Sequence, residues 1–253
     1  MISLTNLDVS YGEKNALNLS GISFSEGTIT SVIGRNGCGK STFLKVLSGV
    51  IPYKGEVKVD TDELSQIPGL LRARKISYLP QRLQNADMTV ETLVSHGRFP
   101  WKSFPRTLTA KDIEIIHESI DKVGLTDHSS KSLKKISGGE LKLAYIAMIL
   151  AQQTDTILLD EPEAHLDIDH REKLYDMLSQ LREEGKTIII ASHYIIETLS
   201  LSDKVIVIDS GEGVFWGDPG ELTADKGLLK KSLGTSVNSS GNDDSLYDYY
   251  YSR

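Results

Sequence analysis

Residues 34–41 read Gly-Arg-Asn-Gly-Cys-Gly-Lys-Ser and fit the pattern G-x-x-x-x-G-K-[ST] at every position. A β-branched run at 28–33 precedes this stretch, and from Lys40 onward apolar residues recur with helical spacing. Strand, glycine-rich turn and helix in this order predict a loop whose backbone N–H groups converge on a phosphate at the positive end of a helix dipole. A chance glycine turn is the alternative, and the flanking strand and helix argue against it.

The loop residues are expected to have separate tasks. Lys40 would reach the β- and γ-phosphates of a nucleotide, and the Ser41 hydroxyl would coordinate Mg²⁺. Cys38 is explained as a small residue that fits the loop, but we expect the helix N-terminus to lower the pKa of its thiol and alkylation there to block nucleotide binding. The predicted nucleotide contacts in this loop are Gly34, Arg35, Asn36, Gly37, Cys38, Gly39, Lys40, Ser41 and Thr42.

Two adjacent carboxylates, Asp160 and Glu161, end the apolar run 156–160. Acids also favour helix N-termini, so the pair alone is ambiguous. Beside a phosphate loop, it predicts that Asp160 holds Mg²⁺, mostly through water, and that Glu161 polarises the attacking water. His193 follows the run 187–191 and would reach the same sheet edge, where an imidazole can hold the water in line. The other five histidines show no metal-ligand spacing.

The apolar runs of the C-terminal half, with a further one at 204–208, alternate with helical patterns at about 169–184 and 194–200. This alternation predicts a parallel sheet covered on both faces, with the ligand at the carboxyl ends of its strands. The N-terminal runs 2–9 and 17–24 alternate like strands of a small antiparallel sheet.

Between these two regions the pattern changes twice. Residues 55–80 read as a mixed, hairpin-like stretch, and 88–152 read as mostly helical, with helical periodicity at 89–96 and 110–123. The sequence therefore predicts a helical insertion between the phosphate loop and the acidic strand end.

The segment Ile136-Ser137-Gly138-Gly139-Glu140 precedes the long apolar helix predicted at 141–152. Ser137 and Glu140 have the spacing of a capping box. Capping does not explain two adjacent glycines, whose bare N–H groups at a helix start make another anion site. Two phosphate sites far apart in sequence make sense if two copies of the chain meet, each nucleotide lying between the loop of one copy and this helix start of the other.

With these motifs in this order, the chain resembles the ABC ATPase family over about residues 1–235, and 136–140 resembles the signature segment of that family. The resemblance implies an α/β fold: a P-loop NTPase, RecA-like core with a small antiparallel β subdomain and a helical subdomain, about 82–152, inserted in it. It also implies ATP hydrolysis with ATP and Mg²⁺.

The resemblance assigns three further residues. Tyr11 would stack on adenine, Gln81 would follow Mg²⁺ and the γ-phosphate, and Asp167 would end the short loop after the catalytic Glu. The expected catalytic residues are then Glu161, His193 and Gln81. The expected Mg²⁺ residues are Ser41, Gln81 and Asp160. Outside the loop, the expected nucleotide contacts are Tyr11, Ser137, Gly138, Gly139, Glu140 and Asp167.

Several positions depart from the family pattern. Glu140 stands where Gln is frequent, and Leu141 and Lys142 replace Gln-Arg types. Glu163 and Ala164 replace Thr and then Ser or Asn. An extra carboxylate beside the site could alter coupling within a dimer, but hydrolysis is still expected because the catalytic residues are retained.

Residues 89–100 resemble importer subunits that serve iron–siderophore, haem and cobalamin permeases, which carry a Gly-Arg-aromatic-Pro segment as at 97–100. An ordinary helix-to-turn connection is the alternative. The resemblance implies a homodimer, peripheral at the cytoplasmic face of the cell membrane, bound to permease subunits that work with a substrate-binding protein. A soluble ABC ATPase of a non-transport machine, such as iron–sulfur assembly, and a P-loop kinase or switch protein are the competing hypotheses. The residues do not encode the cargo.

Composition agrees with this class. The net charge of −7 argues against a sequence-independent nucleic-acid binder, and the single cysteine excludes a disulfide framework within the chain. No secretory signal and no apolar run of roughly 20 residues is visible, so a membrane role is expected to come through a partner. The tail at 236–253 is polar, acidic and rich in tyrosine. We expect it to be poorly ordered, with a docking or modification segment as the alternative.

Overall fold

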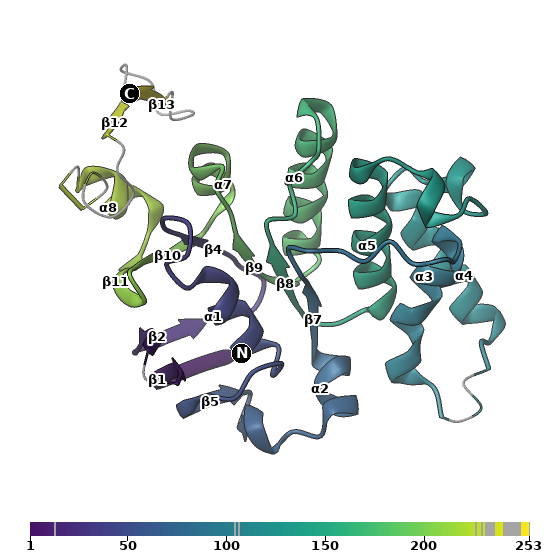
Figure 1. The fold of residues 1–253 in the computed structure, drawn as a ribbon, viewed down its shortest axis with the longest axis horizontal. Coiled ribbons are helices and arrows are strands. Elements are labelled where there is room, and N and C mark those ends of the chain that lie inside the picture. The colour runs from purple at the N-terminus through teal and green to yellow at the C-terminus, as the bar shows by residue number, and fades with distance from the viewer. Residues whose placement is uncertain are drawn as a thin grey trace.

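A computed structural model describes residues 1–12, 14–103, 105, 107–225, 227–228, 230, 236–239 and 249–252. Figure 1 shows the N-terminal strands at one side, the parallel strands in the middle, and the helices of residues 90–152 at the other side. The predicted α/β fold with an antiparallel part and a helical insertion is confirmed.

Five parallel strands form the core of the sheet, in the order β10-β4-β9-β8-β7. Their side chains are almost all buried, as expected for a sheet covered on both faces. The strands are β4 (Ile29–Ile33), β7 (Ile76–Leu79), β8 (Thr156–Asp160), β9 (Thr187–Ala191) and β10 (Lys204–Asp209).

Alternate residues of these strands belong to different hydrophobic clusters. Leu158 and Ile189 pack with helix α1 (Lys40–Leu47), whereas Ile157 and Ile190 pack with residues of α5 (Gly138–Gln152) and α6 (Ile168–Glu183). The period-2 alternation of a strand thus buries both faces. The covering helices of the C-terminal half are α6 (Ile168–Glu183), α7 (Ile195–Leu201) and α8 (Pro219–Ala224).

The antiparallel part is continuous with the core. The described strands here are β1 (Ile2–Tyr11), β2 (Lys14–Leu19), β3 (Ile22–Phe24), β5 (Lys54–Val59), β6 (Asp62–Glu63) and β11 (Glu212–Gly217). β1 pairs with β2, β3 and β5, and β11 bridges β2 to β10. The sequence did not predict β11 or α8.

The prediction of a hairpin-like stretch over 55–80 is wrong in part. Only β5 and β6 pair as a hairpin. A 3-10 turn at Leu64–Gln66 and helix α2 (Gly69–Lys75) then lead away, and β7 pairs in parallel with β8 at the edge of the core sheet. Pairing there lets Ile76 and Leu79 become buried, which a surface hairpin could not do.

The helical insertion contains α3 (Val90–Ser95), α4 (Ala110–Lys122) and α5 (Gly138–Gln152), with 3-10 turns at His96–Trp101, Thr126–His128 and Leu133–Lys135. Thr109 and Asp112 form a capping box at the start of α4. The apolar faces of all three helices join one cluster with β8 and β9.

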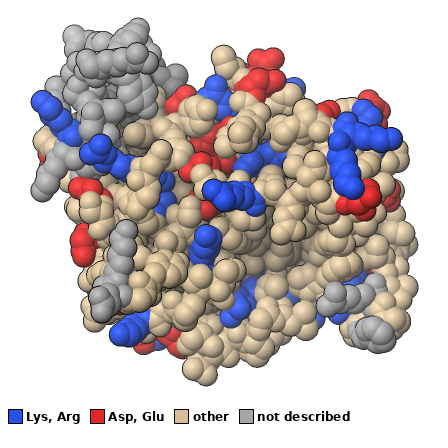
Figure 2. Space-filling view, viewed as in Figure 1, with Lys and Arg blue, Asp and Glu red and all other residues tan. Residues whose placement is uncertain are grey.

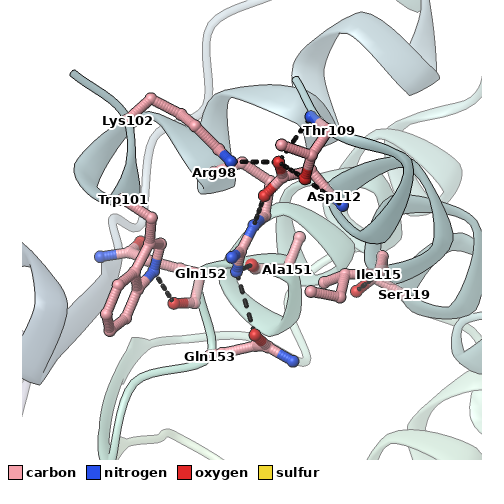
Figure 3. Close-up of polar contacts among 10 residues, drawn as sticks. All are labelled: Arg98, Trp101, Lys102, Thr109, Asp112, Ile115, Ser119, Ala151, Gln152 and Gln153. Carbon is pink, nitrogen blue, oxygen red and sulfur yellow. Dashed lines mark hydrogen bonds and ion pairs between the residues drawn. The ribbon is translucent and has the colours of Figure 1, made fainter. Parts of the chain in front are cut away.

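A buried ionic cluster joins the ends of these helices (Figure 3). Arg98 donates to Asp112 Oδ1 at 3.0 Å and to the Ala151 carbonyl at the end of α5 at 2.7 Å, and Lys102 also pairs with Asp112. Gly97 lies against α5 so closely that a Cβ would be 2.3 Å from the Met148 carbonyl. The Gly-Arg-aromatic-Pro segment therefore holds the insertion together from inside.

In the tail, Ser236–Ser239 pairs antiparallel with Tyr249–Ser252, while 240–248 lie outside the described residues. Whether the tail is poorly ordered stays a prediction. Among the described residues, every helix is too short or too polar to cross a bilayer.

Candidate functional site

The carboxyl ends of the core strands meet at an open cleft of about 800 Å³. The phosphate loop, Gln81, Glu161 and His193 line it together, although they are far apart in sequence. Tyr11, which is 54% exposed, lies at the same cleft. The full lining comprises Tyr11, Asn15, Ala16, Asn36, Gly37, Gly39, Lys40, Ser41, Thr42, Gln81, Glu161, His193, Ser210 and Gly211.

The phosphate loop requires glycine where it passes under strand β10. Gly34 has φ +152°, and a Cβ there would lie 2.1 Å from the Ile208 carbonyl oxygen. Lys40, at the first position of α1, is buried, and its Nζ donates to the carbonyls of Gly34 at 2.7 Å and Arg35 at 3.3 Å. The lysine ammonium is thus held inside the loop, as phosphate binding requires.

The expectation of a lowered thiol pKa at Cys38 is wrong. The side chain is 5% exposed, and burial raises the pKa of the thiol more than the Lys40 charge lowers it. Cys38 is therefore a buried, small residue of the loop rather than a reactive one.

Two of the three predicted Mg²⁺ residues, Ser41 and Asp160, lie together in a way that fits that ion, whereas Gln81 is hydrogen-bonded to Glu161. Ser41 Oγ donates to Asp160 Oδ1 at 3.0 Å, and Tyr78 Oη donates to Asp160 Oδ2 at 3.3 Å. Burial raises the pKa of Asp160, so its charge is costly without a cation nearby. One carboxylate and one hydroxyl beside a phosphate site are the usual protein share for Mg²⁺, which keeps water and phosphate oxygens as its other ligands. The role of Tyr78 was not predicted.

Glu161 is the centre of the predicted catalytic group. Gln81 Nε2 donates to its Oε2 at 2.7 Å, and His193 Nε2 contacts its Oε1. Its backbone has φ +51°, a strained conformation for a non-glycine residue and one that is frequent at functional sites. Two of the three residues predicted to handle the attacking water, Gln81 and His193, thus contact the third, Glu161.

The signature segment lies elsewhere. Ser137 Oγ accepts from Glu140 N at 3.1 Å, and Glu140 Oε2 accepts from Ser137 N at 2.6 Å, so the predicted capping box is confirmed. These hydrogen bonds lower the pKa of Glu140. Within the described residues, the amides of Gly138 and Gly139 have no acceptor, and 137–140 do not line the cleft.

Asp167 is also outside the cleft lining. It is the N-cap of α6 and accepts from His170 N at 2.9 Å. Its local task is helix capping, and contact with a nucleotide stays a prediction.

Some polar residues around the site were missed from the sequence. Lys142, Glu163 and Ser192 are each at most 2% exposed, directly behind the Glu161–His193 pair. The only sequence signal was that two of them depart from the family pattern. The sequence also missed Asn15 and Ala16 of β2 and the turn residues Ser210 and Gly211, which line the cleft together with Tyr11.

Comparison with known proteins gives a consistent result. The family model described as "ABC transporter" matches residues 9–164. The petrobactin import ATP-binding protein YclP of Bacillus subtilis is 38% identical over 225 residues, covering 88% of each chain. The ferric enterobactin transport ATP-binding protein FepC of Escherichia coli is 34% identical over 219 residues, covering 85% of this chain and 81% of its own length.

Solved structures share the fold. A chain from a metal-chelate type ABC transporter in an inward-facing conformation has a TM-score of 0.84 at 21% identity, covering 100% of this chain and 97% of its own. The protein cbiO1 of Clostridium perfringens, part of the ABC transporter complex cbiONQ, has a TM-score of 0.77 at 26% identity, covering 91% of this chain and 93% of its own.

Proposed function

The chain belongs to the ABC transporter family, and on that premise we propose that it is the ATP-hydrolysing subunit of an importer that drives uptake of an iron–siderophore-type cargo. The observation that carries the proposal is the contact of Gln81 and His193 with the Glu161 carboxylate at the mouth of the phosphate loop. No motif taken alone brings these groups together.

The residues suggest the following division of work. Lys40 and the loop amides bind the β- and γ-phosphates, and Tyr11 stacks on the base. Glu161 accepts a proton from the water that attacks the γ-phosphate, while His193 and Gln81 hold the carboxylate and the water in line. Ser41, Gln81 and Asp160 would hold Mg²⁺, which would supply positive charge to the phosphates.

We further propose that two copies form the working unit. The amides of Gly138 and Gly139 lack an acceptor within the described residues and lie outside the cleft of their own chain. A second copy that presents this helix start to the γ-phosphate would satisfy them and would complete the site. Closure on two ATP molecules and reopening after hydrolysis would then move a partner.

The names of the relatives support the importer over a non-transport machine, because they are import and transport ATP-binding proteins for siderophores. The permease subunits, and the substrate-binding protein that delivers cargo to them, are therefore the proposed partners. We propose that residues 1–235 form the ATPase domain, with 82–152 as its helical subdomain, and that it works at the cytoplasmic face of the membrane. On the face drawn in Figure 2, basic and acidic side chains are interspersed.

Affinity purification from detergent-solubilised membranes tests the transport role. The tagged full chain should retain a polytopic membrane protein, and so should the Lys40→Ala variant, which should bind ATP poorly but keep its surface. Recovery of soluble partners alone, in both variants, would contradict the importer and favour a non-transport ATPase.

A further inference from the structure

Lys142 and Glu163 are two buried ionisable residues behind the catalytic group, referred to below as the Lys142–Glu163 pair. They are 2% and 1% exposed, and each affects the pKa of the other. Lys142 lies in the second turn of the signature helix α5, and Glu163 lies in the loop after β8. Charged residues are almost never buried this fully unless polar groups around them are paired with them.

Lys142 holds the backbone of the catalytic residue. Its Nζ donates to the Glu161 carbonyl oxygen at 3.0 Å. Glu161 is the residue with φ +51°, so a fixed carbonyl also fixes the direction of the strained side chain. A charged donor makes this hydrogen bond stronger than a neutral one would be.

Glu163 is connected through Ser192 to the turn that carries His193. Its Oε1 accepts from Ser192 Oγ, and Ser192 Oγ accepts from Tyr194 N at 2.9 Å. The residue between these two is His193, so the carboxylate fixes the turn that carries the imidazole. Lys142 is therefore hydrogen-bonded to Glu161, and Glu163 is hydrogen-bonded to the turn that carries His193.

One member of the pair, Lys142, belongs to the signature helix, and the other lies in a loop against which that helix packs. At the start of α5, a Cβ on Gly139 would lie 3.3 Å from the His165 carbonyl oxygen, so the helix packs closely on the loop that contains Glu163. A displacement of α5 would be transmitted through Lys142 to the Glu161 backbone. Rigid, hydrogen-bonded contacts of this kind can carry such a displacement.

We propose that Lys142 and Glu163 are positioning residues that couple the signature helix to the water-activating pair Glu161 and His193. The proposal rests on the proposed function, because only in the two-copy arrangement does this helix contact the partner's nucleotide. The pair would then link the ATP held by the signature segment to the catalytic residues of the neighbouring site.

The surroundings explain why the pair can be sensitive. Burial raises the pKa of Glu163 to about 7 and lowers the pKa of Lys142. Glu163 Oε2 has no hydrogen-bond partner among the described residues. The other charged groups near the pair are Asp160 and Glu161 at the end of β8. The hydrogen bonding around Lys142 and Glu163 is therefore incomplete, and a small movement of α5 can change which hydrogen bonds are made.

Steady-state ATPase kinetics of the full chain test the proposal. Glu163→Gln, Lys142→Met and the double variant should each lower kcat about tenfold or more, with the KM for ATP within twofold of wild type, because the phosphate loop is untouched. The double variant should be no better than the poorer single variant, since the two substitutions break separate hydrogen bonds, to the Glu161 carbonyl and to Ser192. The control Glu184→Gln alters an exposed carboxylate and should keep the wild-type kcat.

Ser192→Ala is the second variant, because it breaks the link to the His193 turn while the Lys142 and Glu163 side chains both stay in place. It should lower kcat several-fold at unchanged KM. Wild-type kcat in Glu163→Gln and Ser192→Ala would overturn the proposal, and so would a fall in kcat matched by a rise in KM. If the wild-type chain itself does not hydrolyse ATP, the result contradicts the proposed function. If only the variants keep wild-type kinetics, the result contradicts the positioning role of Lys142 and Glu163 alone.

Discussion

Two clusters of this molecule each contain a buried carboxylate, but the two carboxylates differ in how fully they are hydrogen-bonded. In the helical insertion, Asp112 receives hydrogen bonds or ion pairs from Arg98, Lys102 and Thr109 (Figure 3). Although burial alone would raise it, these partners hold the pKa of Asp112 well below its usual range. Behind the catalytic group, Glu163 has one unpaired oxygen and a pKa raised to about 7. The cluster around Asp112, whose hydrogen bonds are satisfied, holds the helical insertion together. The cluster around Glu163, which is not fully satisfied, lies behind the catalytic residues.

The largest effect on stability is expected at Arg98. Arg98→Met leaves Asp112 buried with fewer partners, which should cost about 3–5 kcal/mol in the free energy of unfolding. The ATPase rate per folded molecule should stay within twofold of wild type, because Arg98 does not line the cleft. Urea unfolding and ATPase assays check both points. Lys122→Met, which removes an exposed ion pair with Glu184, should cost less than about 1 kcal/mol. Equal losses in the two variants would contradict the comparison.

A smaller, pH-dependent effect is expected at Glu163. Its folded pKa is raised from 4.5 to about 7, so the folded state binds the proton more tightly than the unfolded chain does. The stability that this provides is fully present below about pH 4.5 and is lost as the pH rises through 7. Glu163→Gln should therefore gain about 2–3 kcal/mol relative to wild type between pH 5 and pH 8, measured by urea unfolding.

Asp112→Asn is the matched opposite. Because the folded pKa of Asp112 is lowered, its contribution to stability is present above the usual aspartate pKa of 3.8 and is lost only as the pH falls below that value. Its effect should be constant between pH 5 and pH 8. A pH-independent effect of Glu163→Gln over the same interval would show that the two carboxylates do not differ as described.

The smallest effects are expected at the two capping boxes. Thr109→Ala and Ser137→Ala each remove the side-chain acceptor at a helix start and should cost about 1 kcal/mol. Only Ser137→Ala should also weaken ATP-dependent association, because only that helix start carries the paired glycines. Thermal unfolding and light scattering with ATP separate the two effects. Equal association in both variants would mean that the start of α5 is merely another capped helix.

The contiguous motifs were predictable from the sequence. The loop at 34–41, the strand ends at Asp160 and His193 and the capping box at Ser137 depend on neighbouring residues, and each lies where it was expected. The helix α2 was missed because seven residues contain too little periodicity to stand out. Strand β7 was misplaced because its partner β8 lies some 80 residues away.

The buried ionic pairs could not be predicted. Lys142 and Glu163 belong to different elements, and charged residues are expected at the surface unless a structure shows otherwise. Arg98 was noted only as part of a segment typical of importers, whereas its partners Asp112 and Ala151 come from two other elements. Propensity and motif patterns contain no information on such long-range pairing.

Size-exclusion chromatography of Glu161→Gln with Mg²⁺ and ATP tests the central claim most directly, because this variant should bind ATP without hydrolysing it. We predict that it elutes as a dimer with ATP and as a monomer with ADP. Adding Gly138→Asp should restore the monomer: a Cβ at Gly138 meets nothing within 4 Å and an acid suits a helix start, so the chain should still fold, but the carboxylate would repel the partner's γ-phosphate. A monomeric Glu161→Gln variant with ATP, or a dimer that survives Gly138→Asp, would contradict the claim that two copies share each nucleotide.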